Sequence, residues 1–185
     1  GGDDRKEGEW TTTSRQVILG KDEGASTLSG DGTIVKKGAG MLNLLYIEDK
    51  YGNFVGGVIG NNLKGTNTGY AWQIEEGMVV ASKQDSLGSA GIFIDSEGTL
   101  GLSICNRNNS LSPVTIIDDI KSGLNTNVFS NKITSSAGEI SIASGSQIEL
   151  NGDIDTVGDN NNLRLTFYQD SALVLSGQNN AENFI

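Results

Sequence analysis

The residues with reactive side chains are few, and they form no catalytic pattern. The sequence contains no histidine, so it supplies neither a Ser-His-Asp nor a Cys-His arrangement. Cys105 lies in a polar segment beside Arg107, a neighbour that favours a thiolate, and we interpret it as an incidental free thiol. The adjacent carboxylates Glu75-Glu76 would point to opposite sides of a strand, which separates them as an acid–base pair. We therefore expect that the protein is not an enzyme.

Two segments loosely match ligand-binding loops. Lys36-Lys37-Gly38 lies in a glycine-rich run, but the spacing of a phosphate-binding loop and its following helix are absent. Asp153 and Asp155 begin like a calcium loop, yet Val157 and Arg164 occupy positions that should carry oxygen ligands. We interpret these residues as corner glycines and a solvated turn, with a looser surface calcium site as the alternative. We expect no cofactor and no metal ion.

Aromatic side chains are the candidates for contact with a partner. Tyr46, Tyr51 and Phe54 lie in or beside a polar turn, and Tyr70 and Trp72 follow downstream. Aromatic groups on a projecting segment contribute large contact areas at modest entropic cost. The alternative is that these side chains cover one edge of the fold, because a hairpin must bury apolar surface to be stable.

The elements that must position these residues follow from a repeated spacing. Two apolar positions alternate, five residues form a glycine-bearing or polar corner, and two more apolar positions alternate. The four copies are Ile34, Lys36, Leu42, Leu44; Ile92, Ile94, Leu100, Leu102; Ile140, Ile142, Ile148, Leu150; and Leu165, Phe167, Leu173, Leu175. Each residue of these copies, apart from Lys36, is expected to lie inside the fold.

The distances between copies indicate stacked units. The last two copies are offset by 25 residues, which aligns Gly152 with Gly177, and the second and third copies are 48 residues apart, close to two periods. A period in the twenties that carries short strands is typical of a solenoid, in which each turn buries its apolar side against the next. We predict an all-β, parallel β-helix.

Composition and charge exclude several classes. The 185 residues include 26 glycines and 36% hydrophobic residues, which suits short strands with tight corners and argues against a helical protein. The net charge of −10 makes nucleic acid an unsuitable partner. No apolar stretch approaches the roughly 18 to 20 residues of a membrane-spanning helix, so we expect no membrane insertion of this segment.

Along the chain we expect one domain, 1–185. Residues 1–15 are expected to be loose or to form a starting edge, and 16–19 the first strand. An insertion at 45–67 contains a β-hairpin excursion near residues 45–59, followed by a loop at 60–69. A second loop, 83–90, points Leu87 inward, and a short helix is expected at 117–121.

Residues 28–44 and 68–104 carry a further pattern of glycines and apolar residues at fixed spacing. Its positions are Ile34, Lys36, Gly38, Gly40, Leu42, Leu44, Thr68, Gly69, Ile74, Gly77, Val79, Leu87, Gly88, Ile92, Gly98, Leu100 and Leu102. This pattern resembles the passenger-associated transport repeat of bacterial autotransporters, the proteins of type V secretion. The insertion 45–67 is longer than the usual link between the two halves of the repeat, and the autochaperone block that closes many passengers is not recognisable.

The resemblance implies a right-handed parallel β-helix that is one segment of a longer passenger, displayed on the bacterial cell surface or secreted. It implies a non-catalytic stalk and adhesin, a virulence factor acting in host contact or aggregation. The expected partners are a host-cell surface protein or glycan, or the same protein on another bacterium, and the segment itself should be a monomer. Two alternatives remain: a bacteriophage fibre or spike segment, and the stalk of a secreted autotransporter protease.

Overall fold

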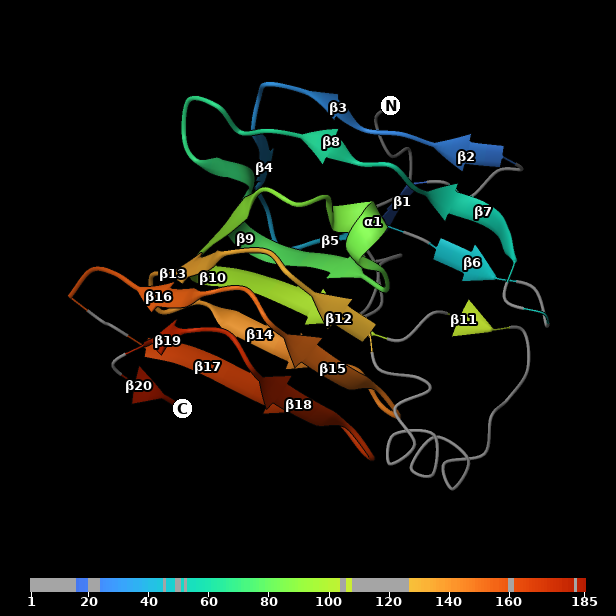
Figure 1. The fold of residues 1–185 in the computed structure, drawn as a ribbon. Coiled ribbons are helices and arrows are strands. Elements are labelled where there is room, and N and C mark those ends of the chain that lie inside the picture. The colour runs from blue at the N-terminus through green and yellow to red at the C-terminus, as the bar shows by residue number, and fades with distance from the viewer. Residues whose placement is uncertain are drawn as a thin grey trace, which may run out of the picture.

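The computed structural model is almost entirely β and mostly parallel (Figure 1). It describes residues 16–19, 24–44, 46–48, 51, 53–103, 106–107, 127–159, 162–181 and 183–185, and only the backbone of 16–19, 24–26, 47–48, 54–55, 106–107 and 183. The all-β prediction is confirmed. Cys105, residues 1–15 and the helix expected at 117–121 lie outside the described residues.

The largest sheet has 11 strands, and its strands pair in parallel. Its main path runs β1-β5-β9-β10-β13-β16-β19. The strands are β1 (Gln16–Leu19), β4 (Ile34–Lys36), β5 (Met41–Leu44), β9 (Tyr70–Ala81), β10 (Gly91–Leu102), β13 (Ile133–Ser135), β14 (Glu139–Ile142), β16 (Ile154–Thr156), β17 (Asn162–Phe167), β19 (Asn179–Asn180) and β20 (Asn183–Phe184).

Strands β9 and β10 each belong to two columns of stacked strands, because each is 12 residues long. Their first halves stack with β4, β13, β16 and β19, which together we call the first column. Their second halves stack with β1, β5, β14, β17 and β20, the second column. Gly77, with φ +74°, and a register shift between Ile94 and Glu97 mark the change of column. The corner predicted at 95–99 is therefore an irregularity within one long strand, whereas the other three predicted corners lie between separate strands.

The other strands form three smaller sheets. The third column contains β12 (Asn127–Phe129), β15 (Gln147–Leu150) and β18 (Ala172–Leu175). A four-stranded sheet is ordered β11-β6-β7-β2, and β3 pairs with β8. Their bounds are β2 (Gly24–Ser26), β3 (Ser29–Gly30), β6 (Tyr46–Glu48), β7 (Phe54–Val58), β8 (Asn62–Leu63) and β11 (Asn106–Arg107). Strand β8 lies within the predicted loop 60–69, and the one-turn helix α1 (Gln84–Leu87) lies within the predicted loop 83–90.

The core is a set of ladders made by apolar residues that occupy the same register position in successive strands. In the first column Trp72 pairs with Ile92, Ile92 with Ile133, and Ile133 with Ile154, and all four are fully or almost fully buried. In the second column Val79, Leu100 and Ile140 stack in the same way. Leu87 is also buried, as predicted. Burying such side chains contributes about 1.5 to 3 kcal/mol each.

Buried asparagines connect α1 to the neighbouring segments. The Asn131 Nδ2 donates hydrogen bonds of 2.8 Å to the carbonyl oxygens of Gly88 and Ala90. The Asn61 Nδ2 donates to the Ser86 carbonyl at 2.9 Å, while its Oδ1 accepts from the Leu63 amide at 3.0 Å. These amides satisfy backbone groups that the short helix leaves unpaired, which lets the chain bury Leu87 there.

Glycines lie where neighbouring strands approach too closely for a side chain. A Cβ added to Gly98 would collide with the carbonyl oxygen of Ile74, and one added to Gly177 would collide with that of Gly152. The predicted alignment of Gly152 with Gly177 is thus explained by stacking. The registers that pair Ile140 with Leu165 and Ile148 with Leu173 confirm the 25-residue offset of the last two copies.

The predicted alignment of the second copy with the third, at an offset of 48 residues, is wrong. Leu100 and Leu102 pair with Ile140 and Ile142, whereas Ile92 pairs with Ile133. The second copy therefore spans the first and second columns, and the third copy spans the second and third. The same spacing of apolar positions occurs at two different corners, so spacing alone does not identify the column.

Phe167 is the one predicted core residue that is exposed, with 50% of its surface accessible. Its partner on one side, Ile142, is fully buried. On its other side β20 pairs only with Asn162 and Leu163, so no described strand covers Phe167. Ile34, Leu42, Leu165, Leu173 and Leu175 are partly buried against the core.

Replacing Gly98 by alanine should destabilise the protein by about 1 to 3 kcal/mol, because the new methyl group would force Ile74 to move. Gly32→Ala is the matched control, since no atom lies within 4 Å of a Cβ there and its φ is not positive. That control should change stability by less than about 1 kcal/mol. Urea denaturation measures both, and equal effects would contradict the stacking described here.

Candidate functional site

The β-hairpin at 45–59 is joined to the structure along both edges. Strands β6 and β7 pair antiparallel, the one antiparallel pair among the described strands, which agrees with the predicted hairpin. Strand β7 also pairs in parallel with β2, and β6 with β11. Val58, at the end of β7, is fully buried. The base of the hairpin is therefore an integral part of the fold. Tyr51 and Asn53, which lie between the two strands and which we call the hairpin tip, are exposed.

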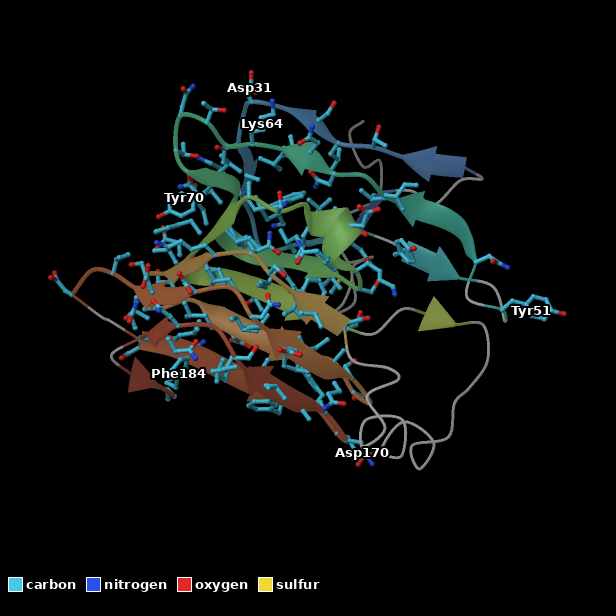
Figure 2. All side chains as sticks on the ribbon, in the orientation of Figure 1. Asp31, Tyr51, Lys64, Tyr70, Asp170 and Phe184 are labelled. Carbon is cyan, nitrogen blue, oxygen red and sulfur yellow. The ribbon has the colours of Figure 1, made fainter. Side chains whose placement is uncertain are left out.

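Tyr51 is the exposed aromatic group of this hairpin. Its side chain is 76% accessible, and Figure 2 shows it reaching away from the strands. Tyr46 is half-buried, and the ammonium nitrogen of Lys83 lies 5.6 Å from its ring centroid, a cation–π arrangement that holds the ring. The side chain of Phe54 lies outside the described residues.

The other two candidate aromatics lie elsewhere. Trp72 is fully buried and its Nε1 donates a 2.9 Å hydrogen bond to the Leu87 carbonyl, so it is a core residue and not a contact residue. Tyr70 is half-buried, and Figure 2 places it on the opposite side of the molecule from Tyr51. Its ring centroid lies 5.4 Å from that of Phe93, with a tilt of 56°. The five predicted residues therefore do not form one site.

Lys36 stabilises the corner between the first and second columns by hydrogen bonds to backbone carbonyl groups. Its ammonium nitrogen donates to the carbonyl oxygens of Lys37 at 3.2 Å, of Glu76 at 2.9 Å and of Gly38. Burial lowers the pKa of Lys36, and the charge of Glu76 opposes that shift. Because backbone carbonyls already surround the ammonium group, the arrangement is a structural clamp, which agrees with the interpretation that excluded a phosphate-binding loop.

Asp153 and Asp155 make hydrogen bonds within the protein. The Asp155 carboxylate accepts hydrogen bonds from Lys132 Nζ at 2.8 Å and from Asn180 Nδ2 at 3.0 Å. The Asp153 carboxylate accepts one from the backbone N–H of Gln178 at 3.3 Å. The hydrogen bond from Lys132, with a further one from Asn180, lowers the pKa of Asp155. Within the part of the chain that the structure describes, no three His, Cys, Asp or Glu side chains gather as metal ligands.

A groove of about 370 Å³ crosses the outer side of the second column. Small residues at Gly101 and Ser141 leave this space between bulkier neighbours, and Tyr168, 55% accessible, lies at one end. Sequence reasoning missed it, because outward-facing residues from different strands form it. Its lining residues are Met41, Met78, Val80, Gly101, Leu102, Ser141, Ala143, Ser144 and Tyr168.

Comparison with known proteins found no matching family model, no matching curated protein and no matching solved structure. Within the described ranges, none of the helical structure has the length and apolar character needed to cross a membrane.

The stabilising contribution of Asp155 should depend on pH. Because its pKa is lower in the folded protein than in the unfolded chain, its contribution is present above the unfolded pKa of about 3.9. It is lost as the pH falls through the lower folded pKa. Asp155→Asn should cost less than about 1 kcal/mol at pH 7, since both partners are partly exposed.

The measurement is chemical denaturation of both proteins at pH 7 and at pH 2.5, where the difference should shrink. Asp31→Asn is the control: its carboxylate is 76% exposed and lies 3.6 Å from Lys64 Nζ. A difference between wild type and Asp155→Asn that grows in acid would contradict this assignment.

Proposed function

We propose that this chain is a segment of a right-handed parallel β-helix belonging to an autotransporter passenger. The supporting observation is the register of the three columns, in which parallel strands place like residues beside one another, at an interval of 25 residues in the last turns. Arg164 and Glu139, Asn180 and Asp155, and Gln178 and Asp153 each bond across the same separation of 25 residues. An interval of this size fits one turn of a solenoid with three short strands.

The passenger segment in this proposal is non-catalytic and is displayed at the bacterial cell surface or secreted. The sequence has no histidine, and its carboxylates at Asp153 and Asp155 bond to protein groups. Its columns form a stalk from which inserted segments project. Lys36, Gly38 and Gly77 match positions of the transport repeat, and in this chain they lie together at one corner. A Cβ on Gly77 would meet both the Lys36 ammonium group and the Gly38 carbonyl oxygen.

The contact with a host-cell protein or glycan, or with another bacterium, is assigned in this proposal to the hairpin tip. Regular corners follow from the geometry of stacked strands, whereas an inserted hairpin does not. Tyr51 is the most exposed aromatic residue among those whose side chains are described. Removing the whole hairpin would also remove Val58, which is fully buried, and would therefore destabilise the fold. A single substitution at the tip tests binding without this loss of stability.

Bacteria displaying the Tyr51→Ala protein should attach to epithelial cells or to one another at least about threefold less than bacteria displaying the wild type. Tyr168→Ala is the matched control, because Tyr168 is also exposed but lies in the turn between β17 and β18 and not in the hairpin. Antibody labelling of intact cells should be equal for all three proteins. Labelling that requires permeabilised cells would contradict surface display, and unchanged attachment would exclude the hairpin tip as the contact.

The purified segment should be a monomer in dilute solution, because stacked columns bury their own core without a partner chain. Light scattering measures the mass, which should match 19.4 kDa. An obligate trimer would favour a bacteriophage fibre, whose core is completed by assembly. The protease-stalk alternative is tested separately, by the presence of a catalytic domain in the gene that encodes this chain.

A further inference from the structure

We propose that the outer side of the first column, around Tyr70 and Phe93, binds an uncharged oligosaccharide. This surface is separate from the hairpin tip, and the inference goes beyond the proposed function, since sugar binding can be measured whether or not the protein acts in adhesion. We call it the Tyr70 surface. Its members are Tyr70, Phe93, Lys132, Thr134, Asp155 and Asn180.

The aromatic part of the Tyr70 surface is fixed by a glycine. A Cβ on Gly91 would lie only 3.1 Å from the Tyr70 Cδ1, so the tyrosine ring uses the space that a side chain would fill. Phe93 lies beside it, with ring centroids 5.4 Å apart. Both rings are half-buried, which holds them in place and leaves part of each accessible. Partly exposed, pre-positioned rings offer apolar faces on which the C–H groups of a sugar can pack.

The polar part of the surface continues the same row. Phe93 pairs with Thr134, Thr134 with Asp155, and Asp155 with Asn180, so these residues follow one another across four parallel strands. Adjacent strands lie about 4.8 Å apart, which presents donors and acceptors at regular intervals. The Asp155 carboxylate is held by Lys132 Nζ at 2.8 Å and Asn180 Nδ2 at 3.0 Å. A carboxylate held in this way, with an amide and an ammonium beside it, matches the paired hydroxyl groups of a sugar.

Thr134 provides an independent observation. Only 3% of its surface is accessible, and its Oγ1 is buried without a hydrogen-bond partner, the one such side-chain atom among the described residues. Leaving a buried hydroxyl unpaired costs free energy, so an orphan group of this kind needs an explanation. Thr134 lies between Phe93 and Asp155 in the row, so a ligand hydroxyl bound between these two residues is placed to pair with its Oγ1.

Charge favours an uncharged ligand. The chain carries a net charge of −10, and the carboxylate of Asp155 lies on this surface, with that of Asp153 two residues away in sequence. Both effects repel sulfated or sialylated glycans, and the ammonium group of Lys132 is already paired with Asp155. Neutral sugars combine apolar ring faces with closely spaced hydroxyl groups, which is the combination that the Tyr70 surface complements.

The test begins with the purified wild-type protein on an array of uncharged glycans, with heparin and sialylated glycans as charged probes. The strongest neutral binder is then titrated by NMR, and chemical-shift changes should map to Tyr70, Phe93, Thr134 and Asp155. Tyr70→Ala should lower the affinity about tenfold, and Tyr168→Ala should leave it unchanged.

Thr134→Val separates binding from stability. Valine has nearly the shape of threonine but lacks the unpaired hydroxyl, so the variant should unfold at the same or a higher temperature than the wild type. Its affinity for the glycan should nevertheless fall about fivefold to tenfold. Binding of charged probes only, no binding to any neutral glycan, or full affinity in both Tyr70→Ala and Thr134→Val would overturn the proposal.

Discussion

Parallel pairing in register is the constraint on which the rest of this structure depends. Each residue of a column lies about one strand spacing from the residue with the same role in the next strand, so like side chains must tolerate close stacking. Trp72, Ile92 and Ile133 satisfy this requirement with apolar contact, and Gly98 satisfies it by having no side chain. At Lys36 a charged side chain occupies a position of the column, and backbone carbonyl oxygens accept hydrogen bonds from its ammonium group.

Sequence reasoning predicted the parts of the fold that depend on local spacing. The alternation of apolar residues identified the strands of the last two copies and their offset, because residues there recur without interruption. It misassigned the columns of the second and third copies, since identical spacing occurs at two corners. It also placed Phe167 inside, because alternation gives the side of a strand but not whether another strand covers it.

The candidate site was less predictable than the fold, for a physical reason. Tyr51 could be identified from its polar turn, which indicates exposure. Trp72 and Tyr70 are close in sequence, yet one is buried and the other reaches the outer side, because the register between β9 and β10 shifts between these two residues. The neighbours of Tyr70 come from other segments: Phe93 lies on β10, and Lys132 immediately precedes β13. Only the register of those strands brings the three residues together.

The stacking of β5 on β9 has a consequence for how such a chain can change over generations. The hairpin of β6 and β7 lies between these strands in the sequence, yet Leu42 and Val79 still pair in register. Length is therefore constrained within a column and along the paired strands β6 and β7, and it can vary at the turn between those two strands. Insertions there can lengthen the projecting segment without disturbing Val58 or the stack. The same turn offers protein engineers a place to graft a foreign peptide.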